Sequence, residues 1–289
     1  MNTKRIKKAV IPVAGFGTRF LPATKSMPKE MLPIIDKPII HYAVEEAVKS
    51  GITEIIFVTG RGKRALEDYF DHSYELEHNL EKAGKTELLK QIKDISDMAD
   101  IVYIRQKQAL GLGHAVLRAR DLVGDEPFAV ILPDDLITCE KPCIKQLAEV
   151  YERTGKSVLA AKETDWDKVS SYGIIDTDSK EKEFEIHGVV EKPAKEDAPS
   201  KLYIVGRYIF NPKVFDYLEQ TKLGKNSEIQ LTDAIEQLVQ NEGVMGVKFD
   251  GEHHDAGEKL GFLKATVSYA LKNEKLSNEL KKYLKEIIK

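Results

Sequence analysis

The feature that most constrains the fold is the alternation of short apolar runs with helical patterns in the first half of the chain. The apolar runs, each expected as a strand, are Lys8–Val13, Glu54–Thr59, Ile101–Arg105 and Phe128–Leu132. Helical patterns separate them, at Pro38–Lys49, at Lys63–Phe70 and from about Gly113 to Leu122. Strands that alternate with helices predict a three-layer α/β/α fold, in which helices cover both faces of a mostly parallel sheet.

The second half of the chain changes character, because strands follow one another with few helices between them. The expected strands are Ser157–Ala161, Gly173–Asp176, Glu185–Val190, Leu202–Phe210 and a strand near Val244–Phe249. Short connections favour antiparallel pairing, so we expect a mixed sheet here. One more helix is expected at Glu228–Gln240.

We predict a single domain over residues 1–289, because the sequence contains no repeat, no low-complexity linker and no clean boundary. A helical insertion is expected at about 71–98, where the rhythm of strands and helices is broken by a stretch rich in Glu, Lys and Leu. Helices from about 257 to 289 are expected to end the chain. A length of 289 residues is enough to bury a sizeable core.

Composition excludes several classes of partner. A net charge of -3 and an isoelectric point near 6.2 give no reason to expect nucleic acid or an anionic membrane as a partner. No apolar run approaches the roughly 20 residues that span a bilayer, and we find no signal peptide. Cys139 and Cys143, the only cysteines, lack further zinc ligands nearby and are interpreted as unpaired thiols at the start of a helix. We therefore expect a cytoplasmic protein.

The loop after the first strand has the properties of a phosphate-binding loop. Gly15 and Gly17 remove side chains there, so backbone N–H groups can approach an anion closely. Arg19 offers a planar fork of donors, and Lys25 and Lys29 add positive charge. At the carboxyl end of a strand, where α/β sheets bind ligands, these residues indicate a polyphosphate site.

Other glycine-rich loops fit this segment less well. A dinucleotide-binding fingerprint needs a small residue where this chain has Phe20, and Pro22 prevents the expected helix, which argues against an NAD-dependent oxidoreductase. A Walker A loop would need Gly-Lys followed by Ser or Thr, which is absent. A plain strand-to-helix turn that carries surface cations stays the alternative.

Carboxylates at a strand end indicate a metal site. Asp134 and Asp135 follow the apolar run of Phe128–Leu132, and hard carboxylate oxygens suit Mg²⁺ beside nucleotide phosphates. A turn or helix cap is the alternative for these aspartates, above all for Asp135. His253 and His254 precede Asp255, but neighbours on an extended chain point to opposite faces, so the three do not converge on one ion.

The motif Gly15–Pro22, read with Pro28–Pro33, resembles the signature of the sugar-1-phosphate nucleotidyltransferases. The fuller stretch Val10–Pro33 is similar to the bacterial UTP–glucose-1-phosphate uridylyltransferases in particular, with Ala14 where thymidylyl- and adenylyltransferases usually have a further glycine. The resemblance continues along the chain through GLGHAV, ILPDD, VVEKP, VGRYIF, EIQLTDAI and HDAGEKLG.

This resemblance implies a Rossmann-like fold of the nucleotide-diphospho-sugar transferase type. It also implies Mg²⁺ as cofactor, UTP and glucose 1-phosphate as substrates, and UDP-glucose and pyrophosphate as products. In-line attack of the sugar phosphate on the α-phosphate needs no protein nucleophile. The family is usually oligomeric, so a homo-oligomer, a dimer or a tetramer, is expected.

The resemblance also implies residue roles. Nucleotide-binding residues would be Ala14, Gly15, Gly17, Thr18, Lys29, Gln106 and Gly111. Sugar-phosphate-binding residues would be Gly173, Glu191, Lys192, Val205 and Gly206. Catalytic residues would be Arg19, Lys29, Asp134 and Lys192, with Asp134 and Asp255 as metal ligands. The Gln106 amide can donate and accept at once, which matches the edge of a pyrimidine.

Two alternatives for the function stay open at this point. A thymidylyltransferase that acts on glucose 1-phosphate would keep the reaction and change the base. A paralogue that binds nucleotide sugar and regulates without turnover would belong to another class of protein. The presence of every charged residue named above argues against the second alternative.

Overall fold

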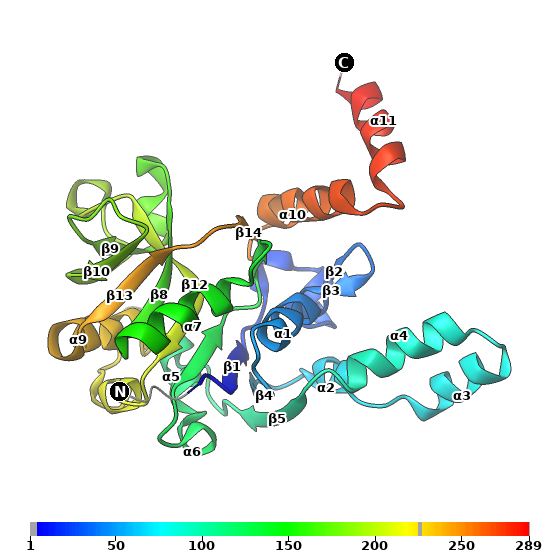
Figure 1. The fold of residues 1–289 in the computed structure, drawn as a ribbon, viewed down its shortest axis with the longest axis horizontal. Coiled ribbons are helices and arrows are strands. Elements are labelled where there is room, and N and C mark those ends of the chain that lie inside the picture. Colours follow the sequence, from blue (N-terminus) through cyan, green and yellow to red (C-terminus); the bar gives the residue numbers. More distant parts are fainter. Residues whose placement is uncertain (1–4, 225–226, 289) are drawn as a thin grey trace.

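The computed structural model describes residues 5–224 and 227–288, and within these residues its centre is a ten-stranded mixed sheet (Figure 1). Eight of its strands lie in the order β10-β13-β8-β12-β6-β1-β4-β5, and β9 and β11 join it through β12. This architecture confirms the predicted α/β fold with a mostly parallel, mixed sheet.

The first half of the chain forms the parallel part of the sheet. Its strands are β1 (Lys8–Val13), β4 (Glu54–Thr59), β5 (Asp100–Arg105) and β6 (Phe128–Ile131). Parallel pairing joins β6 to β1, β1 to β4 and β4 to β5. Within β1, Ile11 and Val13 pack into one core and Val10 packs into the other. Both faces of β1 are therefore buried, which explains its continuous apolar run.

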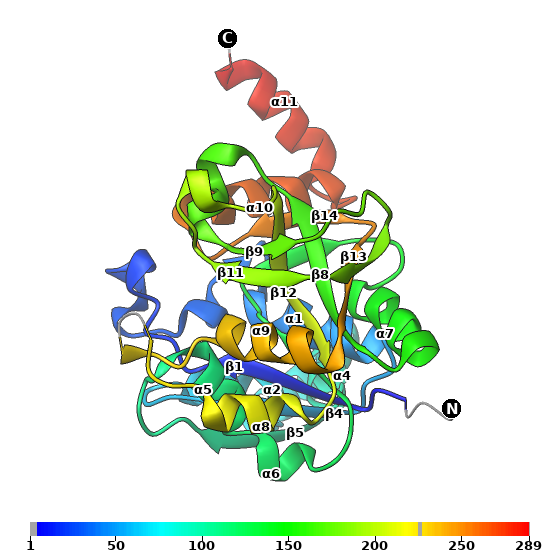
Figure 2. The same cartoon turned by 90° about the vertical axis from the view of Figure 1, so that its left-hand side faces the viewer.

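Helices cover both faces of the sheet (Figure 2). One face packs against α1 (Ile39–Lys49), α2 (Arg64–Phe70) and α7 (Cys143–Thr154). The other face packs against α5 (Gly111–Leu117), α6 (Arg120–Val123), α8 (Val214–Gln220) and α9 (Leu231–Glu242). The expected three layers are thus present.

The second half extends the sheet with β8 (Ser157–Glu163), β9 (Gly173–Asp176), β10 (Glu183–Ile186), β11 (Gly188–Glu191), β12 (Leu202–Phe210) and β13 (Val244–Lys248). The single strand predicted at Glu185–Val190 was wrong, because β10 pairs with β13 while β11 pairs with β9. Ile186 and Val189 are both buried although they are three residues apart. That spacing breaks the period of two and marks the end of one strand and the start of the next.

Other elements also differ from the prediction. The helix predicted at about Gly113–Leu122 is divided into α5 and α6, because the amides of Arg118 and Ala119 bond to carbonyls three residues earlier and so tighten the chain. Two four-residue strands, β7 (Asp135–Thr138) and β14 (Glu252–Asp255), pair with each other and were not predicted from the sequence. A two-residue hairpin, β2 (Pro33–Ile34) with β3 (Lys37–Pro38), precedes α1. Short 3-10 helices lie at Thr18–Phe20, Ala23–Lys25, Lys29–Met31, Trp166–Ser171 and Lys195–Asp197.

Two helical pairs extend away from the sheet (Figure 1). One is α3 (Tyr74–Lys82) with α4 (Thr86–Ser96), which lies within the insertion predicted at about 71–98. The other is α10 (Lys259–Lys272) with α11 (Ser277–Ile287), within the predicted C-terminal helices at about 257–289. The single domain predicted for 1–289 stays a prediction, and residues 1–4, 225–226 and 289 lie outside the described residues.

Two further expectations concern cysteines and membranes. Cys139 and Cys143 are free thiols, and Cys143 is the first residue of α7, as expected. Over residues 5–224 and 227–288, none of the helices combines the length and the apolar character needed to cross a bilayer.

One ion pair is fully enclosed in the core. The Arg207 guanidinium of β12 donates to Glu46 Oε2 of α1 over 2.9 Å, and the relative exposure of Arg207 is 1%. Arg207 also donates to the carbonyl oxygens of Leu132 (2.8 Å) and Asp135 (2.7 Å), which bracket the turn after β6. Glu46 Oε1 accepts the Ile144 N–H at the start of α7. The pair therefore connects α1, α7, β12 and this turn.

Replacing Arg207 by Met should lower the free energy of unfolding by about 3–5 kcal/mol, because Glu46 would be left as a buried charge without its partner. The matched control is Arg153→Met, which removes an exposed pair with Glu183 and should cost no more than about 1 kcal/mol. Urea denaturation of both variants measures the difference. Equal losses in the two variants would contradict the structural role of Arg207.

Candidate active site

Two adjoining cavities open at the carboxyl ends of β1 and β6. The first, of about 440 Å³, is lined by six of the seven predicted nucleotide-binding residues, namely Ala14, Gly15, Thr18, Lys29, Gln106 and Gly111. The second, of about 310 Å³, is lined by Gly173, Glu191, Lys192 and Gly206 of the predicted sugar-phosphate set, together with Arg19 and Asp255. Four residues line both cavities, and they are Leu112, Leu132, Asp134 and Glu228. Asp134 therefore lies where the two cavities meet.

The loop after β1 is held in shape by Gly17, although Gly17 itself does not line the first cavity. Its φ of 65° is left-handed, and an added Cβ would lie 3.0 Å from the Cβ of Lys29. The Thr24 hydroxyl donates to the Gly17 carbonyl over 2.7 Å, and so does the Phe20 amide over 3.0 Å. Gly15 has open space on its Cβ side, which leaves its backbone accessible to a ligand.

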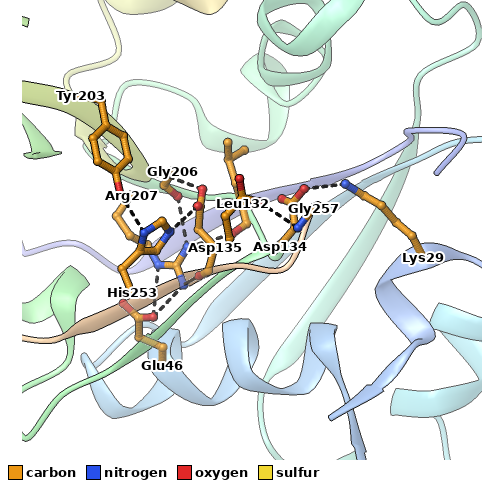
Figure 3. Close-up of polar contacts among 11 residues, drawn as sticks. Lys29, Glu46, Leu132, Asp134, Asp135, Tyr203, Gly206, Arg207, His253 and Gly257 are labelled. Carbon is orange, nitrogen blue, oxygen red and sulfur yellow. Dashed lines mark hydrogen bonds and ion pairs between the residues drawn. The ribbon is translucent and has the colours of Figure 1, made fainter. Parts of the chain in front are cut away.

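Lys29 and Asp134 form an ion pair between the two loops, with Lys29 Nζ 2.6 Å from Asp134 Oδ2 (Figure 3). Burial disfavours the charged forms of Lys29 and Asp134, but the attraction between the two opposite charges outweighs this effect. The pKa of Lys29 is raised by Asp134 and Glu30, and the pKa of Asp134 is lowered chiefly by Lys29. Both groups are therefore charged at neutral pH.

Glu30, the residue after Lys29, is held by a buried ion pair with Lys63. Glu30 is 1% exposed and its carboxylate accepts a hydrogen bond from Lys63 Nζ over 2.7 Å. Burial raises the pKa of Glu30 in spite of this partner. We did not predict this pair from the sequence. A glutamate between Lys29 and a buried apolar segment nevertheless indicates that its carboxylate has a partner inside the protein.

The Gln106 side chain is fixed by two contacts on its amide nitrogen. This nitrogen donates to the carbonyl of Gly111 over 3.0 Å and lies 3.0 Å from Nδ1 of His114, whose pKa is lowered by burial. Gly111 has a φ of 92°, and an added Cβ would lie 2.7 Å from the Cβ of Glu228. Gly111 thus allows the close packing that closes this end of the first cavity.

On the sugar-phosphate side, Glu191 is oriented by two neighbours. The Thr232 hydroxyl donates to Glu191 Oε2 over 2.6 Å, and Lys192 Nζ lies 2.9 Å from Glu191 Oε1. Lys192 has a φ of 46°, a strained conformation for a side chain of this size, and its amide donates to the Tyr172 carbonyl. Gly173 lies against the Glu191 carboxylate, because an added Cβ would be 3.3 Å from Oε2.

Gly206 and Val205 have different surroundings. An added Cβ on Gly206 would lie 2.3 Å from Asp135 Oδ2 and 2.5 Å from the Cβ of Leu132, so only glycine fits between β12 and the turn. The Val205 side chain is 1% exposed in the core and does not line the second cavity, contrary to the prediction. Side chains alternate along β12, so the Val205 side chain points to the opposite face of the sheet from the position of Gly206, which lines the second cavity.

Asp134 and Asp255 approach each other at Gly257. An added Cβ on Gly257 would lie 2.9 Å from Asp134 Oδ2 and 2.9 Å from Asp255 Oδ1, with Arg19 Nη1 3.7 Å away. The pKa of Asp255 is raised by burial and by the charges of Asp135 and Asp134. The space beside Gly257 thus lies between two carboxylates, and the negative charge of Asp255 is disfavoured there. A divalent cation would fit such a site. Among residues 5–224 and 227–288, no group of three or more His, Cys, Asp or Glu residues could hold a metal ion.

Several residues at the site were not predicted from the sequence. Tyr203 and Thr232 line the second cavity, and Tyr203 belongs to a hydrogen-bonded chain with His253 and Asp135. The sequence alone does not pair His253 with Asp135, because the two residues lie 118 positions apart. The two histidines do point to different partners, as expected for neighbours on a strand: His253 contacts Asp135 and His254 contacts Glu252.

The fold and these paired cavities define a transferase that joins a nucleotide to a second phosphorylated substrate. The sequence profile described as nucleotidyl transferase matches residues 8–272, and the chain belongs to this family. A UTP–glucose-1-phosphate uridylyltransferase of Staphylococcus haemolyticus (strain JCSC1435) is 55% identical over 285 residues, which cover 98% of this chain and 99% of that protein. A second uridylyltransferase, from Staphylococcus saprophyticus (strain ATCC 15305), is 53% identical over the same lengths.

Solved structures agree with these relatives. A UTP-bound UDP-glucose pyrophosphorylase of Acinetobacter baumannii is 42% identical, with a TM-score of 0.90, and the match covers 97% of this chain and 99% of that one. A UDP-glucose pyrophosphorylase in complex with UDP-glucose is 46% identical, with a TM-score of 0.85, over 93% of this chain and all of that one. Over nearly its whole length the chain is therefore similar to proteins named as UTP–glucose-1-phosphate uridylyltransferases and UDP-glucose pyrophosphorylases.

The Lys29–Asp134 pair gives a pH-dependent prediction. Because the pKa of Asp134 is lowered by folding, its contribution to stability is complete above its unfolded pKa of about 4 and is lost as the pH falls through the folded value. In Lys29→Met, Asp134 would be buried without this partner. We expect this variant to be less stable than the wild type at pH 7 and the difference to shrink below about pH 4. Urea denaturation between pH 3 and pH 7 measures it, and a constant difference would contradict the pairing.

Proposed function

We propose that this protein catalyses the formation of UDP-glucose and pyrophosphate from UTP and glucose 1-phosphate. The observation that carries the proposal is the pair of adjoining cavities that share Asp134, one with the predicted nucleotide residues and the other with most of the predicted sugar-phosphate residues. The uridylyltransferase relatives, at 52–55% identity over 98% of the chain, support the choice of substrates.

The chemistry is an in-line displacement at phosphorus. A phosphate oxygen of glucose 1-phosphate attacks the α-phosphorus of UTP, and pyrophosphate leaves from the opposite side. The attacking oxygen is already ionised, so the protein needs no nucleophile of its own. Its task is to align two anions that repel each other and to stabilise the charge that develops between them.

Cations of the site suit this task. Lys29 is held at the junction of the cavities by Asp134, where it would stabilise charge on the α-phosphate. Arg19 lines the second cavity and would hold phosphate oxygens with its planar fork. Lys192, on its strained backbone, would direct the phosphate of the sugar while Glu191 accepts sugar hydroxyls. Each of these three cations would thus stabilise negative charge on phosphate groups of the substrates.

We propose Mg²⁺ as the cofactor, held by Asp134 and Asp255 on the two sides of Gly257. Mg²⁺ is bound through one or two carboxylates together with substrate phosphates and water, which agrees with a site of two aspartates. When bound it neutralises phosphate charge. The raised pKa of Asp255 supports the assignment, because a cation would relieve the repulsion from Asp134 and Asp135.

The base would be recognised by Gln106 and Gly111. The side-chain amide nitrogen of Gln106 donates a hydrogen bond to the Gly111 carbonyl and lies beside His114. The side-chain oxygen of Gln106 takes no part in these two contacts, and it would accept the N3–H of uracil. A thymine presents the same edge and adds a methyl group, so recognition of this edge does not distinguish UTP from dTTP. The glycine at 111 leaves its backbone available to the base.

Two wider proposals complete the function. We propose a cytoplasmic enzyme, in agreement with two free thiols, and a homo-oligomer, either a dimer or a tetramer. Exposed apolar side chains on the C-terminal helices support an association of copies, and they include Leu260, Leu263, Tyr283 and Ile287.

The reaction is tested by measuring pyrophosphate release with glucose 1-phosphate and Mg²⁺, with UTP, dTTP, ATP, CTP or GTP supplied separately. We expect release with UTP to exceed release with every other nucleotide. Asp134→Ala is the inactive control, because it removes a carboxylate shared by both cavities.

Each other outcome points to a different correction. A preference for dTTP would leave the reaction intact and overturn the assignment of the base. No release with any nucleotide, from protein that binds UDP-glucose, would instead support a regulatory protein.

Thr232→Val should raise the KM for glucose 1-phosphate about tenfold and leave the KM for UTP within about twofold, because the variant keeps the side-chain shape and removes the hydrogen bond that orients Glu191. Initial rates at varied substrate concentrations measure both constants. The matched control is Thr221→Val, whose hydroxyl donates to the Tyr217 carbonyl away from both cavities and should leave both constants unchanged. An unchanged KM for glucose 1-phosphate in Thr232→Val would show that Glu191 needs no support.

A further inference from the structure

A chain of hydrogen bonds joins Tyr203, His253, Asp135 and Gly206 beside Asp134 (Figure 3). Tyr203 Oη of β12 is 2.9 Å from His253 Nδ1 of β14, and His253 Nε2 is 2.6 Å from Asp135 Oδ1 of β7. The second oxygen of Asp135 accepts the Gly206 N–H of β12 over 3.0 Å. The chain therefore leaves β12 at Tyr203, crosses two strands and returns to β12 three residues later.

The direction of these bonds follows from the acceptors. The Asp135 carboxylate only accepts, so His253 donates its Nε2–H to it. In the neutral ring Nδ1 then accepts the O–H of Tyr203, whose pKa is raised by burial and by the Asp135 charge, so that its proton stays in place. The His253 side chain is 5% exposed, and both of its ring nitrogens have partners.

This chain fixes the two strands that carry Asp134 and Asp255. In the antiparallel pair of β7 and β14, Asp135 lies directly opposite Asp255, and His253 is two residues before Asp255 on the same face. The bond from His253 to Asp135 therefore crosses the pair diagonally. Asp134 directly precedes Asp135, and its carbonyl accepts the Ala256 N–H over 2.7 Å. Any shift between the strands would change the distance between the two carboxylates at Gly257.

We propose that His253 is a positioning residue that sets the separation of Asp134 and Asp255 through Asp135, and thereby sets the affinity for the divalent cation. This inference rests on the proposed function, which makes these aspartates metal ligands. His253 acts through its hydrogen bonds to Tyr203 and Asp135, and it does not line either of the two substrate cavities. Partners of this kind behind a metal site commonly change affinity 10- to 100-fold when removed.

The test compares His253→Gln with His253→Asn. Glutamine can place its amide N–H on Asp135 and its oxygen toward Tyr203, whereas asparagine is one methylene shorter and reaches Tyr203 only. Binding of Mn²⁺, a spectroscopic substitute for Mg²⁺, is measured by electron paramagnetic resonance with the full-length protein saturated with UTP. We expect the Kd for Mn²⁺ to rise at least about tenfold in His253→Asn and to stay within about threefold of the wild type in His253→Gln.

Two further measurements separate positioning from damage to the fold. UTP binding without metal should be the same within about twofold in the wild type and both variants, and their thermal unfolding should remain cooperative. If His253→Asn fails to fold, Tyr203→Phe replaces it, because it removes only the hydroxyl that orients the ring; a Kd for Mn²⁺ raised clearly beyond the threefold range allowed for His253→Gln is expected there, and a Kd within that range would overturn the inference.

Equal Mn²⁺ affinity in the wild type and in folded His253→Asn would overturn the inference. Equal weakening in Asn and Gln would do the same, since the bond to Asp135 would then not be the cause. Failure of the proposed function looks different: the wild type itself would show no Mn²⁺ binding that depends on UTP, or no release of pyrophosphate.

Discussion

The site depends on one buried guanidinium. Arg207 lies beneath the turn from Leu132 to Asp135 and holds the carbonyls at both of its ends, and Glu46 neutralises its charge. This turn carries two aspartates into a cavity, and the guanidinium supplies donors to the carbonyls at both of its ends, in line with the rule that buried backbone carbonyls find hydrogen-bond partners. Since Glu46 also binds the first turn of α7, the position of Asp134 is tied to the main core rather than to a surface loop.

Charge balance at the site explains which groups are paired before substrates arrive. Asp134, Asp135 and Asp255 approach one another from β6, β7 and β14, and three carboxylates at such distances repel. Lys29 balances the first, and His253 with Gly206 binds the second. Among the described residues the Asp255 carboxylate accepts the Gly257 amide, and its pKa is raised by burial and by the charges of Asp135 and Asp134. Asp255 is therefore the carboxylate whose negative charge is least balanced by the protein. A cation that binds with the nucleotide would stabilise this charge.

The sequence predicted β1, β4, β9 and β12 to the residue, because each carries neighbouring apolar residues that are buried in the sheet. It did not predict β7 and β14, which are only four residues long and whose partners lie more than 100 positions apart in the sequence. The loop residues and Asp134 were found from their chemistry at strand ends. Partners such as Glu46 for Arg207 are 161 positions apart, and no local pattern relates them.

The order of strands explains why Asp134 lies where the two cavities meet. From β1 the chain runs outward through β4 and β5, and then returns to place β6 on the other side of β1. The loops after β1 and β6 therefore diverge, and the crevice between them is where open α/β sheets bind ligands. Beyond β6 the next strand is β12, which is antiparallel and bulged between Val205 and Tyr208, and the second cavity opens beside it. In the described sheet β6 lies between the parallel strand β1 and the antiparallel strand β12, so a residue at its end can line both cavities at once.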